Sequence, residues 1–314
     1  MKYASALPII LMLAACNPKE EPKPEPLGPI SEVEIVSPLC PPKGYDRASV
    51  LALKEAGFEL TDASERQAFA INIVECLNNP DPVLRDGVAY RALAHMLREK
   101  QLAPETLHAL TTGLQGKLEA EDPDGFGQPF AALALSEVAR ADRIEAFLSE
   151  EELLQLLVKA QHYMINVRDY RGFSESEGWR HGVAHGADLL MQLALNERID
   201  REGLELVRDA VAVQVAPKGH AYVFGESERL TQTVLAMATR GAFSEKQWTA
   251  WLKEVCGPGE LESWDRAFAS EEGLARLHDV RAFLGALYLN AKLGSDEKDD
   301  ALLKGVEAAL KALP

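Results

Sequence analysis

Apolar residues along most of this chain recur at the spacing of an amphipathic helix. Beyond Tyr45 they repeat at positions i, i+3, i+4 and i+7, and short breaks containing Gly, Pro, Asn or Asp separate the stretches. The predicted helices come in pairs: 63–78 with 83–98, 104–118 with 126–141, 150–166 with 178–195, 201–215 with 226–240, and 245–254 with 271–292, followed by 296–312. The clearest alternating run, Ala210 to Val215, lies inside one of these stretches. The pattern predicts an all-α fold.

The predicted pairs form a loose repeat. Their starts lie roughly 45 to 50 residues apart, at the upper edge of the period of HEAT-like helical hairpins. Asn79 to Arg85 resembles the turn and second-helix start of a HEAT repeat, with Asp81 as the cap and Pro82 at the first helical position. One hairpin cannot bury its own apolar face, whereas several stacked hairpins share a core. We therefore expect residues 45–314 to form an irregular HEAT-like α-solenoid of paired antiparallel helices.

The first residues have the pattern of an export signal. Lys2 precedes an uncharged apolar stretch from Ala6 to Ala15, which is far shorter than the roughly 20 residues of a membrane-spanning helix. No later segment is apolar enough to span a membrane. Residues 1–15 are therefore predicted to be a signal peptide.

The sequence Leu13-Ala14-Ala15-Cys16 resembles the lipobox of bacterial lipoproteins. The resemblance implies lipidation of Cys16, cleavage before it, and a stable membrane anchor. The alternative is an ordinary secreted protein with a chance cysteine at the cleavage site. Because Asn17 rather than Asp follows, the expected location in a Gram-negative host is the periplasmic side of the outer membrane. Residues 16–44 are rich in Pro and Glu, and we expect them to be a tether extending about 3.1 Å per residue.

The net charge of the chain narrows the possible partners. A formal net charge of −16 disfavours binding to nucleic acid or to anionic lipid.

The cysteines allow one disulfide. Besides Cys16, the chain has Cys40, Cys76 and Cys256, so an oxidising compartment permits one disulfide. Cys40 can pair with Cys76 or with Cys256, and the spacing does not choose. The simpler interpretation of Cys76 is a small buried hydrophobic residue.

The segment from Arg168 to Leu190 concentrates polar and aromatic residues that a plain helical repeat does not need. A polar loop containing Asp169 and Arg171 leads into a predicted helix that carries Trp179, His181, His185 and Asp188. The last three are spaced i, i+4, i+7 and are expected on one helix face. Gly182 and Gly186 thin this helix, which indicates that something approaches it closely.

Three interpretations of this segment remain open. His181, His185 and Asp188 can hold a divalent metal ion. The histidines can instead line a binding groove together with Trp179, or they can make hydrogen bonds between helices in a polar core layer. A spacing of two histidines does not decide among these.

A second polar cluster begins a later predicted helix, with Tyr222, Glu226, Glu228 and Arg229. Stacking of the pairs is expected to bring this helix start beside His181. Glu226 or Glu228 would then supply an acid, base or ligand, and Arg229 an anion contact. The alternative is that the glutamates only stabilise the helix start. The chain has no GxSxG, P-loop, GxGxxG or HExxH motif of known enzyme classes.

Four segments resemble domain-of-unknown-function family 2785: Leu84 to Tyr90, Gly125 to Arg143, Arg171 to Leu190, and Tyr222 to Leu230. The resemblance covers about residues 50–250. It implies an all-helical HEAT-like fold and gives no substrate or activity.

The function expected from these features is binding at a membrane. We predict an extracytoplasmic lipoprotein that acts as a binding or scaffold module, through a concave helical surface, for an envelope protein or peptide. The alternative is a metal-dependent or acid–base hydrolase centred on His181, His185 and Asp188, with Glu226 or Glu228 carrying the proton.

Overall fold

The computed structural model describes residues 40–294 and 299–314. The chain divides into two units, Met1–Ser37 and Pro38–Pro314, and every element described here belongs to the second. The predicted signal peptide, the predicted lipidation site Cys16 and the predicted tether up to residue 39 lie outside the described residues.

The described part of the chain is almost entirely helical, so the predicted all-α class is confirmed. Its α-helices are α1 (Arg47–Glu55), α2 (Ala63–Asn72), α3 (Pro82–Leu84), α4 (Arg91–Arg98), α5 (Pro104–Glu119), α6 (Gly127–Ile144), α7 (Glu150–Asn166), α8 (Gly182–Ala194), α9 (Arg201–Gln214), α10 (Glu226–Thr239), α11 (Glu245–Val255), α12 (Glu271–Leu293) and α13 (Asp299–Lys311). A two-stranded antiparallel hairpin, β1 (Phe173–Ser174) and β2 (Gly178–Trp179), precedes α8. None of the described helices is long and apolar enough to cross a membrane.

Many of these helices begin where the sequence supplies a capping side chain. Ser149 and Ser244 each form a capping box at the starts of α7 and α11. Asp81 accepts a hydrogen bond from the Val83 amide, and Pro82 is the first residue of α3, as expected. The local signals therefore place most helix starts within a residue or two of their predicted positions.

Two predicted helices are interrupted. The stretch 63–78 is α-helical only to Asn72 and continues as the 3-10 helix η1 (Ile73–Asn78). The stretch 83–98 is α3, then the π-helix η2 (Arg85–Tyr90), then α4. A π turn contains an extra residue and is often found at functional sites. Here it begins at the fully buried Arg85, whose side chain makes long-range contacts.

The N-terminal boundary also differs from the prediction. Cys40 and Cys76 form a disulfide, so the last residues of the predicted tether are fixed to the body and begin its fold. Cys76 is buried, but it is a bonded half-cystine and not only a small hydrophobic residue, while Cys256 is free and buried. The following helix, α1, is not among the predicted helices; its sequence RASVLALKE is short and buries only Val50.

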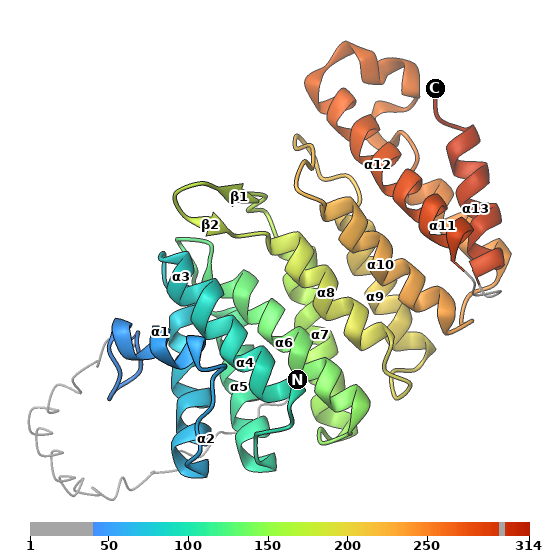
Figure 1. Cartoon of the computed structure of the whole chain (residues 1–314). Helices are drawn as coiled ribbons and strands as arrows, with labels where there is room; N and C mark the ends of the chain where they lie inside the picture. Colours follow the sequence, from blue (N-terminus) through green and yellow to red (C-terminus); the bar gives the residue numbers. More distant parts are fainter. Residues whose placement is uncertain (1–39, 295–298) are drawn as a thin grey trace, which may run out of the picture. The chain divides into compact units, whose positions relative to one another are not determined.

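Helix packing follows the order of the chain. The helices α4, α6, α8, α10 and α12 each pack against the next of the series, and α5, α7 and α9 do the same in a second series. Figure 1 shows the hairpin at the N-terminal end of α8, beside α3. One continuous core of buried apolar side chains runs from Val50 to Ala309.

Candidate functional site

The β1–β2 hairpin replaces the first turns of the helix expected from residue 178. Phe173 pairs with Trp179 across the two strands, and their rings lie 5.0 Å apart between centroids. Gly178 has φ = +73°, and a Cβ there would lie 2.9 Å from Pro82 Cβ, so only glycine fits. Trp179 therefore belongs to a strand and not to α8. The predicted helix 178–195 is present as α8 but begins four residues later, at Gly182, because α3 and its neighbours hold the hairpin by contacts distant in sequence.

His181 is the N-cap of α8 and adopts the left-handed conformation, with φ = 59° and ψ = 40°. This conformation is uncommon for a residue with a Cβ and persists only where surrounding contacts hold it. The imidazole stacks on Trp179, with 4.6 Å between centroids, and its ring lies 5.7 Å from that of His185. The two histidines are therefore neighbours, as the spacing predicts, although His181 precedes the helix.

Glu226 is the first residue of α10 and meets His181 from the other side. Its Oε1 lies 3.5 Å from His181 Nε2, and its Oε2 accepts a hydrogen bond of 3.0 Å from the Phe224 amide. Burial raises the pKa of the Glu226 carboxyl, against the lowering effect of its backbone hydrogen bonds. The expected approach of this helix start to His181 is confirmed.

Three buried polar atoms around this contact have no hydrogen-bond partner in the described residues. They are His181 Nε2, His185 Nδ1 and Ser227 Oγ, and the three side chains belong to buried residues. The 3.5 Å contact of His181 with Glu226 is within ion-pair distance but lacks hydrogen-bond geometry. Buried polar atoms in folded proteins are nearly always paired, so such a cluster indicates a ligand or ordered water.

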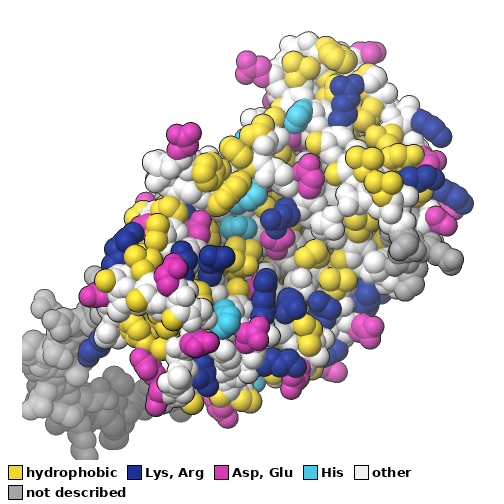
Figure 2. All heavy atoms as spheres, in the orientation of Figure 1, with side chains coloured by type: hydrophobic (Ala, Val, Ile, Leu, Met, Phe, Trp, Pro, Cys, Tyr) yellow, Lys and Arg dark blue, Asp and Glu magenta, His cyan; other side chains and the backbone are white. Residues whose placement is uncertain are grey.

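Three exposed aromatic rings lie beside these atoms: Trp179 stacks on His181, and Phe173 and Phe224 each contact Trp179. Phe173, Trp179 and Phe224 are 45 %, 36 % and 40 % exposed, and the Trp179 and Phe224 rings lie 6.0 Å apart between centroids. Figure 2 shows hydrophobic side chains forming a ridge over the hairpin and the loop before α10, with histidine side chains beside it. We name the following set the hairpin site: Phe173, Trp179, His181, His185, Phe224, Glu226 and Ser227.

Asp188 faces Arg229 rather than the histidines. Its Oδ2 forms an ion pair with Arg229 Nη1, one turn of α8 beyond His185. Burial raises the pKa of Asp188, and the Arg229 guanidinium opposes that shift. In the described part of the chain, no group of three or more His, Cys, Asp or Glu side chains is arranged to hold a metal ion. Because the Asp188 carboxylate is paired with Arg229, the structure does not place it beside the two histidines as a ligand.

Asp169 and Arg171 form a second ion pair, in the loop between α7 and β1. Arg171 donates to Asp169 through Nε at 2.8 Å and through Nη2, and Nη2 also reaches the Asp124 carbonyl at 3.3 Å. This pair lines an open cleft of about 590 Å³ with Phe173, His220 and Phe224. The polar loop therefore lies next to the hairpin site.

A family model described as Protein of unknown function (DUF2785) matches residues 110–289, more than half of the chain. The chain belongs to this family. No curated protein and no solved structure matches it. The DUF2785 match begins and ends later than the expected 50–250, and it contains the whole hairpin site. The family description names no activity, so the function must be argued from the site itself.

Besides the two ion pairs, two more of the predicted site residues in this DUF2785 chain, Tyr222 and Glu228, lie outside the hairpin site. Tyr222 is buried, and its amide and hydroxyl bond to Asp279 and Gln214, so its role is structural. Glu228 is exposed at the start of α10 and forms no ion pair with His181. The carboxylate that meets His181 is Glu226.

Sequence reasoning missed Phe173, Phe224 and Ser227, and it treated Arg85 only as part of a polar helix start. Phe173 lies in the two-residue strand β1 and Phe224 in the loop before α10, and neither segment has a periodicity from which exposure could be predicted. The prediction that another group closely approaches α8 at Gly182 and Gly186 is confirmed. A Cβ at Gly186 would lie 2.9 Å from Met164 Sδ, and one at Gly182 would lie 3.1 Å from the Tyr163 hydroxyl. The approaching element is α7 and not a ligand.

The buried histidine predicts an acid-sensitive stability. Desolvation, aided by nearby positive charge, lowers the pKa of His185 from 6.5 to about 3. Below pH 6.5, His185 is therefore protonated in the unfolded chain but stays neutral in the folded chain. The free energy of unfolding should fall by about 1.4 kcal/mol per pH unit, or roughly 2 kcal/mol from pH 6.5 to 5. His185→Gln should reduce the slope by this amount, measured by urea unfolding across that range, while His181, whose pKa is also lowered, keeps its own contribution.

The difference between the two proteins isolates His185, because other groups are common to both. Asp279, whose pKa burial raises to about 6, acts in the opposite direction but cancels in the comparison. His162→Gln, a change at an exposed position of α7, should retain the wild-type slope. Equal slopes for wild type and His185→Gln would contradict the prediction.

Proposed function

We propose that this DUF2785 member is a membrane-tethered binding module of the bacterial cell envelope. Lipid on Cys16 would anchor it outside the cytoplasm, at the periplasmic side of the outer membrane in a Gram-negative host, and the Pro/Glu-rich segment would carry the helical body away from the lipid. The lipobox-like sequence and the preceding apolar stretch support this placement.

The body would be a HEAT-like α-solenoid of paired antiparallel helices with a concave binding face. The support is the order of packing, in which each helix of the α4, α6, α8, α10 and α12 series contacts the next. Stacks in which each repeat touches its neighbours present extended surfaces suited to binding.

The observation that carries the binding proposal is the hairpin site. Trp179 stacks on His181 and is flanked by the exposed rings of Phe173 and Phe224. His181 is buried, held in a strained conformation and left with a nitrogen that has no hydrogen-bond partner in the described residues. Aromatic residues, and Trp above all, supply most of the energy at protein interfaces. Backbone strain and unpaired buried groups are also concentrated where proteins bind ligands.

The partner fitting this surface is a protein segment with one apolar side chain and one hydrogen-bonding group. The apolar side chain would pack among Phe173, Trp179 and Phe224, and the polar group would pair with His181. The flanking charges are already neutralised in pairs, Asp169 with Arg171 and Asp188 with Arg229. Such a mixed rim around an apolar centre is typical of a protein interface, not of a nucleic-acid surface.

Trp179→Ala should weaken partner binding about 30-fold to 1000-fold, since a central Trp commonly contributes 2–4 kcal/mol. The full lipidated protein, solubilised with its envelope in mild detergent, is crosslinked and its partners are identified by mass spectrometry. The dissociation constant of each purified candidate is then measured. Leu293→Ala, at a position 83 % exposed near the end of α12, is the matched control.

Binding that survives in Leu293→Ala and is lost in Trp179→Ala supports the proposal. An identical set of partners with unchanged dissociation constants for both variants would sink it.

The contact of His181 with Glu226 favours one alternative, an acid–base hydrolase. Desolvation lowers the pKa of His181 to about 4, so its imidazole is neutral near pH 7 and can accept a proton. The raised pKa of Glu226 suits the complementary acid. Cleavage of the bound partner by wild type, abolished by Glu226→Gln without loss of binding, would support this alternative over simple binding.

A further inference from the structure

A second cavity lies between the ends of α4, α5 and α6, and it shares no residue with the hairpin site. It is a cleft of about 390 Å³ with mostly apolar walls. Its principal apolar residues are Met96, Leu97, Leu102, Leu107, Ile144 and Phe147. Ligand pockets in proteins commonly have volumes of about 300–1,000 Å³ and apolar walls with a few polar groups. The size and lining therefore suit a small apolar molecule.

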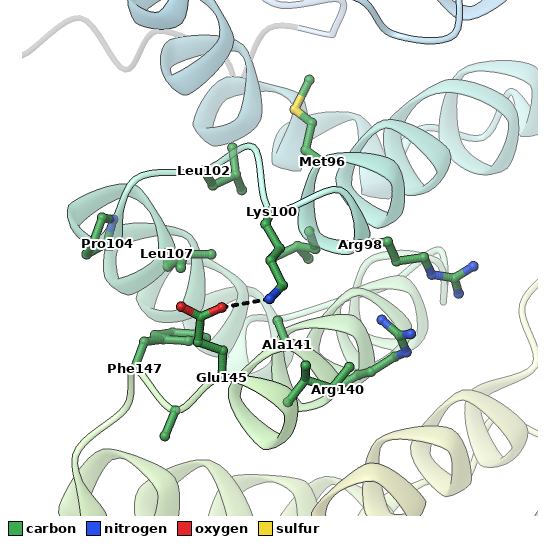
Figure 3. Close-up of a pocket in the computed structure, with 13 residues that line it drawn as sticks. Met96, Arg98, Lys100, Leu102, Pro104, Leu107, Arg140, Ala141, Glu145 and Phe147 are labelled. Atoms are coloured by element: carbon green, nitrogen blue, oxygen red, sulfur yellow. Dashed lines mark hydrogen bonds and ion pairs between the residues drawn. The ribbon is translucent and has the colours of Figure 1, made fainter.

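The polar groups of the cleft are mainly cationic. Arg98, Lys100 and Arg140 line it, against the single carboxylate of Glu145. Figure 3 shows the Arg98 and Arg140 side chains extending to one side of the cleft, opposite Phe147 and Pro104. In a chain with a net charge of −16, this local excess of positive charge is unexpected. It is complementary to an anion.

Two of the three cations already have carboxylate partners. Arg98 pairs with Glu137, and Lys100 Nζ lies 2.8 Å from Glu145 Oε2. The Arg140 guanidinium makes no hydrogen bond or ion pair with any residue in the ranges 40–294 and 299–314. Lys100 and Glu145 are well exposed, and an exposed ion pair is weak enough for a ligand to displace. Arg140 is therefore the cation available to a bound anion.

We propose that this cleft binds a single-chain alkyl carboxylate, of the fatty-acid class. The alkyl chain would lie along Met96, Leu102 and Phe147, and the carboxylate would pair with the Arg140 guanidinium. The planar guanidinium matches a carboxylate through two parallel hydrogen bonds. Neither the DUF2785 match nor the proposed binding at the hairpin site assigns this cleft.

The volume of the cleft favours one short chain over a phospholipid. A space of 390 Å³ has room for about a dozen water-sized groups, which corresponds to one chain of roughly ten carbons with its head group. Two long acyl chains do not fit. Affinity should rise with chain length up to this limit and no further.

Calorimetric titration of unit Pro38–Pro314, whose described contacts and disulfide are internal, tests the proposal. The probes are hexanoate, octanoate, decanoate and 1-octanol, each below its critical micelle concentration. Two added methylenes should strengthen binding about tenfold, from octanoate to decanoate. Arg140→Gln should weaken decanoate binding by about tenfold to a hundredfold and leave 1-octanol binding unchanged.

Two further variants sharpen the test. Arg91→Gln removes an exposed arginine of α4 that does not line the cleft, and it should bind decanoate as wild type does. Ala141→Trp fills the cleft and should abolish binding of both decanoate and 1-octanol. If Ala141→Trp does not fold, as judged by circular dichroism, the comparison of Arg140→Gln with wild type and the comparison of chain lengths still test whether the cleft binds an alkyl carboxylate.

Three results would overturn the proposal. The first is no decanoate binding by the folded wild-type unit. The second is equal binding of octanoate and 1-octanol, unaffected by Arg140→Gln. The third is binding to phosphatidylglycerol vesicles that depends on Arg140, without binding of free decanoate, because it would identify a membrane rather than a single-chain ligand.

Discussion

Replacing Arg85 with alanine should lower the free energy of unfolding by about 3 kcal/mol, because it removes the buried cation of a partly buried ion pair together with its hydrogen bonds. The Arg85 side chain is fully buried, and its Nε lies 2.7 Å from Asp86 Oδ1. Its Nη1 donates to the carbonyls of Asn79 and Pro80, at 3.0 and 3.3 Å. The substitution would leave all three acceptors without this cation.

The same guanidinium links parts of the chain that are distant in sequence. Its Nη2 donates a hydrogen bond of 2.7 Å to the carbonyl of Glu177, which lies in the turn of the hairpin, 92 residues away. Its Cζ lies 4.2 Å from the ring centroid of Phe126 and 4.8 Å from that of Phe130, at the start of α6. Arg180 approaches Phe126 as well, at 4.0 Å. Cation–π contacts of this kind are strongest where water is excluded.

Thermal and urea unfolding of Arg85→Ala measure the effect. The melting temperature should fall by on the order of 10 °C. Arg91→Ala, on the exposed side of α4, is the matched control and should change stability by less than about 0.5 kcal/mol. Equal stability of the two variants would show that the buried network contributes nothing net.

Removing Arg85 should also disturb the hairpin site. Since Arg85 holds the Glu177 carbonyl, its removal frees the turn that positions Trp179. Partner binding should therefore weaken in Arg85→Ala even at temperatures where the protein remains folded.

Breaking the Cys40–Cys76 disulfide should have a comparable effect, about 4 kcal/mol. The bond closes a loop with a sequence separation of 36, which contains α1 and α2. In the chain-entropy account, crosslinking a loop of this length restricts the unfolded chain by about that amount. The double variant Cys40→Ser, Cys76→Ala should unfold at correspondingly lower urea concentration.

Reducing agent provides the paired measurement. Dithiothreitol should destabilise the wild type to the level of the double variant and leave the double variant unchanged. Cys256→Ala removes a free thiol and should retain the full response to dithiothreitol. A wild type whose stability is unaffected after complete reduction, with the free thiols counted, would contradict the prediction. Dependence on an oxidised bond also accords with the proposed location outside the cytoplasm.

The helices were largely predictable because their signals are local. The apolar spacing of α5, α7 and α9 and the caps at Ser149 and Asp200 are complete within one stretch of sequence. The approach of Glu226 to His181 was also predictable, because stacked helix pairs bring equivalent starts together. The export signal and lipid attachment rest on the sequence alone and stay predictions.

The tertiary structure decided the features that depend on contacts between distant residues. The hairpin forms within the predicted polar loop and takes in Gly178 and Trp179 from the predicted helix, because Arg85 and Pro82 contact Glu177 and Gly178. Asp188, in register with the histidines along the sequence, turns instead to Arg229.

Cys40 forms its disulfide with Cys76, a pairing that the sequence spacing left open. The sequence by itself therefore determined the helical class, most helix positions and the neighbourhood of the site. Periodicity and caps act within a few residues, whereas the partner of each buried charge, ring and thiol is fixed only when distant segments pack and water is excluded.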